Sequence, residues 1–266
     1  MIFNAKESTL HLGNLQMDYI TFGKGTQPLI MIQGHNTRGL HGAAGSLAWM
    51  YRIFAKDYKV YLFDRRKNLP EDFTVRDIAR DIAAAMDHLS LSHADVLGVS
   101  MGGMIAQHLA IDRPDLVRRM VLAVTMSRPN TTFEKVIGNW IRLTEQGNFK
   151  ELIRNMTYLM YSEQYIKRYL PFLPLLTHLQ KPRDVQRFIT LSKACLTCRA
   201  YDDLDKIQCP VLVIGAEKDQ IAIPEASMEM AQKLQCELNM YENLGHAAYE
   251  EAKDFNSRVY QFLKGS

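Results

Sequence analysis

Three side chains in this sequence have the right types and order to attack a carbonyl carbon together. Ser100 lies in the run DVLGVSMGGMIAQHLA, Asp219 in VLVIGAEKDQIAIP and His246 in LNMYENLGHAAYEE. A serine hydroxyl is a weak nucleophile at neutral pH, so it needs a base to take its proton and an acid to orient that base. The chain order serine, aspartate, histidine therefore predicts a Ser–His–Asp triad for acyl transfer.

The residues around Ser100 predict a sharp turn from a strand into a helix. GVSMG matches the pattern G-x-S-x-G at Gly98, Ser100 and Gly102; an apolar run leads in and a helical pattern leads out. Glycines two residues on either side remove Cβ atoms that would collide where strand and helix meet. This setting favours a nucleophile at Ser100, and the alternative is a serine that only caps the helix.

The acid and the histidine both have competitors. Glu217 lies closer to the end of its strand than Asp219, and we favour Asp219. Of the eight histidines, His246 follows a glycine directly after the last predicted strand, which is the position that the base requires. Three others fall within helical segments or near a strand start, where we expect satisfied surface or boundary residues: His88, His93 and His108.

Short apolar runs alternate with helical patterns along most of the chain. Strands are predicted for a pair within 10–23 and at 28–34, 58–64, 95–100, 118–125, 209–216 and 236–245, and helices at 74–89, 101–114, 225–235 and 252–265. Runs that are apolar on both faces are typical of buried parallel strands. The pattern predicts an α/β protein with a doubly wound, mostly parallel sheet and right-handed crossovers.

One long segment interrupts this alternation. Residues 126–205 contain no convincing strand and read as helices broken by glycine and proline. We therefore assign residues 1–125 and 206–266 to the core and residues 126–205 to an inserted helical cap. Residues 126–200 carry 12 Lys and Arg against 5 Asp and Glu. A solvated helical face explains this excess, and attraction of an acidic substrate is the alternative.

The motifs GVSMGG, PVLVIGAEKDQIAIP and LGHAAYEE together resemble the α/β-hydrolase fold superfamily, in its branch of cap-bearing, carboxylesterase-like serine hydrolases. The resemblance covers nearly the whole chain. It implies an oxyanion hole made of two backbone N–H groups. These belong to Met101, directly after the nucleophile, and to His35 in LIMIQGHNTRG, with Asn36 as the alternative to His35.

Two loops depart from the pattern of these relatives. Gln33 stands where relatives often carry a histidine before the glycine, and Arg66 is followed by Lys67 and Asn68 where they commonly show glycines. The first change replaces a side chain and does not affect donation by a backbone N–H group. The second predicts a different path for the loop.

The predicted cap should lie over Ser100 and supply part of a substrate pocket, as the resemblance implies. Its aromatic and methionine side chains either line an apolar pocket or form the core of the cap itself. The candidate substrate-binding residues are Gly34, Asn36, Trp140, Tyr158, Met160 and Tyr161, with Met156 and Phe172 as further cap candidates.

The expected activity is hydrolysis of a small carboxylic ester, or a related acyl bond, through an acyl-enzyme. The same triad would serve a carbon–carbon bond hydrolase or a lyase-like relative, and a ligand receptor without turnover could also retain it. A serine at position 100 argues against the haloalkane dehalogenase and epoxide hydrolase relatives, which carry an aspartate there. No cofactor and no metal are implied, because side chains and backbone supply every catalytic part.

Composition limits the partners. A net charge of +3 with no basic run argues against nucleic acid, and no signal peptide or membrane-spanning stretch is evident. The four cysteines then read as reduced thiols of a cytoplasmic protein, and Cys195 and Cys198 form a CxxC without a second ligand pair. We expect a small-molecule substrate, no nucleic-acid partner and no membrane partner; the sequence leaves the oligomeric state open.

Overall fold

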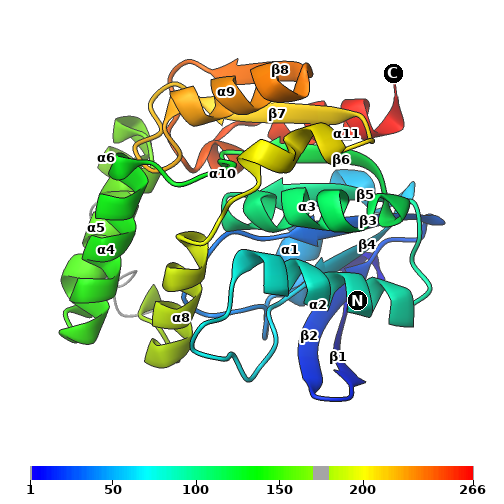
Figure 1. The fold of residues 1–266 in the computed structure, drawn as a ribbon, viewed down its shortest axis with the longest axis horizontal. Helices are drawn as coiled ribbons and strands as arrows, with labels where there is room; N and C mark the ends of the chain where they lie inside the picture. The colour runs from blue at the N-terminus through cyan, green and yellow to red at the C-terminus, as the bar shows by residue number, and fades with distance from the viewer. Residues whose placement is uncertain (1, 170–179, 266) are drawn as a thin grey trace.

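The computed structural model describes residues 2–169 and 180–265, which are built around one eight-stranded sheet (Figure 1). The strand order is β1-β2-β4-β3-β5-β6-β7-β8, and β2 is antiparallel to both neighbours, whereas all pairs from β4 to β8 are parallel. The strands are β1 Lys6–Leu12, β2 Leu15–Phe22, β3 Gln27–Ile32, β4 Tyr58–Phe63, β5 Ala94–Val99, β6 Val117–Ala123, β7 Val211–Ala216 and β8 Glu237–Tyr241. The predicted mostly parallel sheet is confirmed.

Helices cover both faces of the sheet (Figure 1). They are α1 Ala44–Met50, α2 Val75–His88, α3 Met101–Asp112, α9 Pro224–Leu234, α10 Ala248–Glu251 and α11 Phe255–Lys264. Residues of α2, α3 and α9 share one hydrophobic core, and residues of α1 and α11 share the other. Thr74 begins α2 with the expected capping box, in which its hydroxyl accepts from the backbone N–H of Asp77.

The central strands are buried on both faces, which explains their continuous apolar sequences. In β3, Ile30 and Ile32 join the core beneath α2 and α3, whereas Leu29 and Met31 join the core beneath α1 and α11. Successive side chains of a strand point to opposite faces, so a strand covered on both sides is apolar at every position. The central strands can therefore hold polar groups only at their ends.

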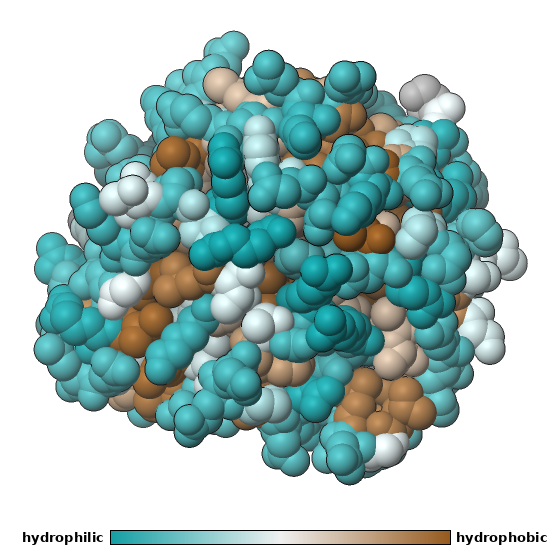
Figure 2. All heavy atoms as spheres, viewed as in Figure 1, coloured by the Kyte–Doolittle hydropathy of each residue, from teal (hydrophilic) through white to brown (hydrophobic). Residues whose placement is uncertain are grey.

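A helical segment connects β6 to its sheet neighbour β7. Its described helices are α4 Thr131–Glu145, α5 Phe149–Met160, α6 Glu163–Tyr169 and α8 Val185–Cys195, followed by a 3-10 turn at Tyr201–Lys206. Figure 1 places α4, α5, α6 and α8 together at one end of the sheet, rather than on either face. Figure 2 shows the molecule from the same direction as Figure 1. The visible surface is mostly hydrophilic, and apolar side chains are visible at the left, where α5 and α8 lie.

His108 differs from the sequence-based expectation. It lies on α3 with 3% of its surface exposed, and neither ring nitrogen has a hydrogen-bond partner among the described residues. Burial therefore lowers the pKa of His108 to about 4, which keeps the ring neutral. The prediction of a satisfied boundary residue was wrong, because α3 is covered on all sides rather than on one face.

Within residues 2–169 and 180–265, none of the helices is both long enough and apolar enough to cross a bilayer.

The ends of β3 and β5 approach the start of α3 so closely that two positions require glycine. A Cβ atom on Gly102 would lie 1.9 Å from the carbonyl oxygen of Ile32 in β3, and one on Gly98 would lie 2.6 Å from the carbonyl oxygen of Gly102. Both neighbours are backbone atoms, which cannot turn aside as a side chain would. These contacts fix α3 directly against the sheet.

We predict that Gly102→Ala destabilises the protein by about 3 kcal/mol or prevents folding, because an added methyl group must push α3 away from β3. Gly138→Ala is the matched control. Gly138 is exposed inside α4 and an added Cβ meets nothing within 4 Å, so the change should stabilise by about 0.5–1 kcal/mol. Urea unfolding measures both values, and equal stabilities of the two variants would contradict the assigned contact.

Candidate active site

Ser100 occupies the turn between β5 and α3 in a strained backbone conformation. Its φ of 54° and ψ of −121° are unusual for a residue with a side chain. The backbone around it is held firmly, since its N–H donates to the carbonyl of Ala123 (2.9 Å) and its carbonyl accepts from the Thr125 hydroxyl (2.7 Å). The Ser100 side chain makes no capping bond to α3, so its hydroxyl is available for another partner.

That partner is His246, which also contacts Asp219. The Oγ of Ser100 lies 2.8 Å from Nε2 of His246, and Nδ1 of His246 lies 2.8 Å from Oδ2 of Asp219. Ser100 follows β5, Asp219 follows β7 and His246 follows β8, so each comes from the carboxyl end of a parallel strand. The structure thus brings together three residues that are up to 146 positions apart in sequence.

Asp219 is buried, and its two oxygens have separate partners. Its side chain accepts hydrogen bonds at Oδ1 from the backbone N–H groups of Ile221 (2.8 Å) and Ala222 (2.9 Å), which leaves Oδ2 for His246. With 4% of its surface exposed, the carboxylate is shielded and needs these donors. The competitor Glu217 is exposed, and the acid that contacts the histidine is Asp219.

The loop that carries His246 is tied to the helical segment. The backbone N–H of Ala247 donates to the carbonyl of Met160 (2.8 Å), and a Cβ on Gly245 would lie 2.9 Å from the same oxygen. The backbone N–H of Ser162 donates to the Glu251 carboxylate (2.9 Å) on α10. The position of the imidazole therefore depends on where α5 ends.

The loop after β3 lies against Ser100. A Cβ on Gly34 would lie 3.2 Å from the Cβ of Ser100, so a side chain at position 34 would crowd the hydroxyl. Within the described part of the chain, nothing accepts a hydrogen bond from the backbone N–H of His35 or of Met101. Two unpartnered donors next to a candidate nucleophile are what an oxyanion hole requires.

The imidazole of His35 is directed at helix α8. Its Nε2 lies 2.8 Å from the hydroxyl oxygen of Ser192, and its ring packs on Phe188 with centroids 4.4 Å apart. Burial and the nearby guanidinium groups of Arg65 and Arg187 lower the pKa of His35 to about 3, so the ring is neutral. This side chain anchors its loop to α8.

Sequence reasoning did not assign roles to Arg65 and Arg187. Arg187 of α8 donates to Asp64 (3.0 Å) and to the carbonyls of Arg65 (3.1 Å) and Arg66 (2.6 Å), which joins α8 to the loop after β4. Arg65 donates to the carbonyls of Gln33 and Gly34. The only sequence signal was that Lys67 and Asn68 follow Arg66 where relatives commonly show glycines, and that signal concerned the path of the loop.

The candidate substrate-binding residues occupy different settings. Gly34 and Asn36 line a cavity of about 170 Å³, whose walls include Leu47, Met50 and Leu97. Trp140 is 4% exposed and donates to Asn155 (2.9 Å) within the helical segment, whereas Tyr158 is 40% exposed on α5.

The remaining cap candidates lie near the His246 loop or outside the described residues. Met160 contacts that loop through its carbonyl, and Tyr161 donates to Glu250 (2.7 Å). Met156 is partly buried against the core, and Phe172 lies outside the described residues. The structure therefore places Gly34, Asn36, Met160 and Tyr161 close to the loops of the site.

Cys195 and Cys198 are buried free thiols, and burial raises the pKa of each to about 12, so they stay protonated. In the two described ranges, no group of three or more His, Cys, Asp or Glu side chains could hold a metal ion. The chemistry available at this site is that of a hydroxyl, an imidazole, a carboxylate and backbone N–H groups.

Known proteins resemble this chain over most of its length. A relative from Rhizobium rhizogenes named as carbamate hydrolase RutD is 23% identical over 240 residues, which cover 85% of this chain and 90% of the relative. The 2-hydroxy-6-oxononadienedioate/2-hydroxy-6-oxononatrienedioate hydrolase of Paraburkholderia xenovorans is 25% identical, with 94% and 91% covered. The crystal structure of the enol-lactonase from Burkholderia xenovorans superposes with a TM-score of 0.84 at 20% identity and covers 97% of this chain and 100% of that one.

We predict that His35 makes the protein sensitive to acid. Its folded pKa of about 3 lies below the ordinary value of 6.5, so the unfolded state binds more protons between these values and stability falls as the pH drops from 6.5. Between pH 8 and pH 5 this term amounts to about 2 kcal/mol. Between pH 8 and pH 5, His35→Gln should lose about 2 kcal/mol less of its free energy of unfolding than wild type, as measured in urea. His108 adds the same pH-dependent loss to both proteins. Equal losses in the two proteins would rule out a partly buried, neutral His35.

The sequence and the fold both assign this chain to one known family. The sequence profile described as alpha/beta hydrolase fold matches residues 39–253, which is most of the chain. The superposed crystal structure supports the same fold. This chain belongs to the alpha/beta hydrolase fold family.

Proposed function

We propose that the protein is a serine hydrolase that cleaves a small carboxylic ester or lactone through an acyl-enzyme. The observation that carries this proposal is the continuous contact from Ser100 through His246 to Asp219, with 2.8 Å at each step. These distances are those of hydrogen bonds between a nucleophile, its base and the group that orients the base.

In the proposed first step, Oγ of Ser100 attacks the carbonyl carbon and Nε2 of His246 takes its proton. Asp219 accepts the Nδ1–H of His246, which fixes the tautomer and stabilises the imidazolium that forms. The backbone N–H groups at Ile221 and Ala222 keep the carboxylate in this orientation. The carbonyl oxygen becomes an alkoxide, which the N–H groups of His35 and Met101 would stabilise.

The remaining steps return the enzyme to its starting state. The carbon–oxygen bond to the leaving group breaks as His246 donates its proton to the leaving oxygen, and the acyl group stays on Ser100. Water then attacks this acyl group while His246 takes a proton from the water, and Ser100 leaves with that proton. The products are an acid and an alcohol; for a lactone, both groups belong to one molecule.

The substrate class is supported by the relatives and by a small cavity lined by the loop after β3. Relatives carry the names of an enol-lactonase and a carbamate hydrolase, both of which act at a carbonyl carbon bound to a heteroatom. The cavity of about 170 Å³ beside Gly34 and Asn36 is small and has mainly apolar side-chain walls. It suits a short acyl or alkyl group better than a long chain.

We predict that Ser100→Ala lowers kcat on p-nitrophenyl acetate by roughly 10³-fold or more, because Ser100 carries the hydroxyl that hydrogen-bonds to His246 in the described structure. The variant should also fail to react with a fluorophosphonate, in which the serine oxygen displaces fluoride. Ser92→Ala, at an exposed position eight residues upstream, is the matched control and should behave as wild type. Full activity and labelling of the Ser100→Ala variant would eliminate the proposal.

A carbon–carbon bond hydrolase is the second candidate, favoured by the name of the Paraburkholderia xenovorans relative. In that reaction the leaving group is a stabilised carbanion, which must be protonated instead of an alkoxide. We expect kcat/KM on short p-nitrophenyl esters to exceed that on a 2-hydroxy-6-oxo-dienoic acid by at least tenfold. Steady-state assays of both substrates decide the matter, and the opposite ranking would replace the ester proposal by the second candidate.

A further inference from the structure

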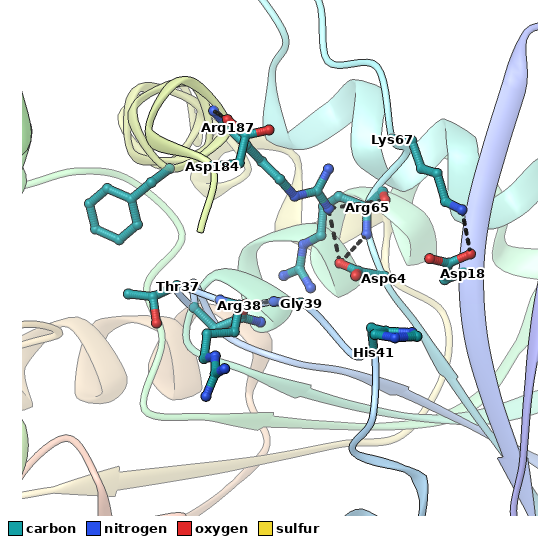
Figure 3. A pocket seen from close by; sticks show the side chains of 12 residues that line it. Asp18, Thr37, Arg38, Gly39, His41, Asp64, Arg65, Lys67, Asp184 and Arg187 are labelled. Carbon is teal, nitrogen blue, oxygen red and sulfur yellow. Dashed lines mark hydrogen bonds and ion pairs between the residues drawn. The ribbon is translucent and has the colours of Figure 1, made fainter. Parts of the chain in front are cut away.

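Arg65 is a buried cation directly beneath the loop that approaches Ser100. Only 3% of its surface is exposed, and it borders a cavity of about 280 Å³ between the loops after β3 and β4 and helix α8 (Figure 3). Its Nη2 donates to the carbonyl of Gln33 and, at 3.4 Å, to that of Gly34. A buried guanidinium group is costly to desolvate, so a residue kept there needs a physical explanation.

The charge of Arg65 is not neutralised by an ion pair. The neighbouring Asp64 accepts at Oδ1 from Arg187 (3.0 Å) and from the backbone N–H of Arg65 (2.7 Å), and at Oδ2 from the N–H of Leu40 (3.2 Å). Figure 3 shows the Arg187 pair and the Arg65 backbone contact as dashed lines that end on Asp64. In the described structure the Arg65 side chain pairs with no carboxylate, and its Nε has no acceptor.

The two carbonyls held by Arg65 determine the direction of the neighbouring N–H groups. In a trans peptide the C=O and the N–H point in opposite directions, and there are no cis peptides in the described chain. Because the carbonyl of Gly34 faces the guanidinium group, the N–H of His35 in the same peptide plane faces away from it. This is the N–H that lacks an acceptor and belongs to the loop packed against Ser100.

We propose that Arg65 is a positioning residue for the oxyanion hole, which holds the Gly34–His35 peptide with its N–H turned to the reacting oxygen and polarises that peptide by its positive charge. This inference rests on the proposed serine hydrolase function and adds a residue that the family motifs do not include. Arg65 does not touch the substrate; it acts through the peptide.

Two physical effects combine in this arrangement. A cation at the carbonyl end of a peptide withdraws electron density from the amide, which makes its N–H a stronger donor to a developing alkoxide. The interaction is preorganised, because the opposite side of the loop is anchored by His35 on Ser192 and Phe188. A neutral His35 adds no second charge beside the guanidinium group.

The test compares Arg65→Met, Arg65→Gln and Arg65→Lys with wild type and with the matched control Arg80→Met, which removes an exposed arginine from α2. For each protein, kcat and KM are measured on p-nitrophenyl acetate, together with the rate of fluorophosphonate labelling and the affinity for a trifluoromethyl ketone, which forms an oxyanion on Ser100. Circular dichroism and melting temperatures report folding.

We expect Arg65→Met to lower kcat by roughly 10- to 100-fold, with KM within about threefold of wild type. The affinity for the trifluoromethyl ketone should fall by a factor similar to that in kcat. The lysine variant, which keeps the charge, should recover part of this loss, and the glutamine variant should recover less. Arg80→Met should match wild type. If Arg65→Met does not fold, the other proteins still test the proposal. Both kcat and the affinity for the ketone should then decrease in the order wild type, Arg65→Lys, Arg65→Gln.

Two results would overturn the inference. The first is a folded Arg65→Met or Arg65→Gln protein with wild-type kcat and ketone affinity. The second is a loss of kcat with unchanged ketone affinity, which a purely structural role would produce. Failure of the wild-type protein to react with the fluorophosphonate would contradict the proposed function itself. Equal rates of labelling of wild type and Arg65→Met would contradict only the role of Arg65.

Discussion

The close approach of β3, β5 and α3 at Ser100 is the constraint on which the rest of the site depends. The turn holds Ser100 at a φ of 54°, and this is possible only because Gly98 and Gly102 bring backbone against backbone. The same approach brings the loop after β3 to the serine, so that a Cβ on Gly34 would lie 3.2 Å from the Cβ of Ser100. One packing arrangement thus positions both the hydroxyl and the candidate oxyanion donors.

The partners of Ser100 are held by polar contacts at the end of an apolar sheet. Asp219 depends on two backbone donors in its own loop, and the His246 loop depends on the carbonyl of Met160 in the helical segment. On the other side, α8 contacts the loop after β3 through His35 and the loop after β4 through Arg187. The helical segment is therefore part of the scaffold of the site, because it orients loops from both halves of the sheet.

Several of these features could be predicted from the sequence, and others could not. The strand runs, the helix after Ser100 and the capping box at Thr74 were all predictable, because strand alternation, helical spacing and capping are local. The direction of the His35 ring was not predictable, since it depends on Ser192, which lies 157 residues away. The burial of His108 was missed for the same reason, because neighbours outside α3 cover its exposed-looking face.

The sequence by itself determined the fold class and named Ser100, Asp219 and His246, because a strand that is buried on both faces must be apolar and its polar residues must follow its end. Only the tertiary structure decided that these three lie 2.8 Å apart at each step, that Asp219 rather than Glu217 contacts the imidazole, and that Arg65 lies beneath the loop at Ser100. These are relations between segments distant in the chain. No local pattern encodes them, since their distances follow from how the strands are ordered in the sheet and how the loops pack at its end.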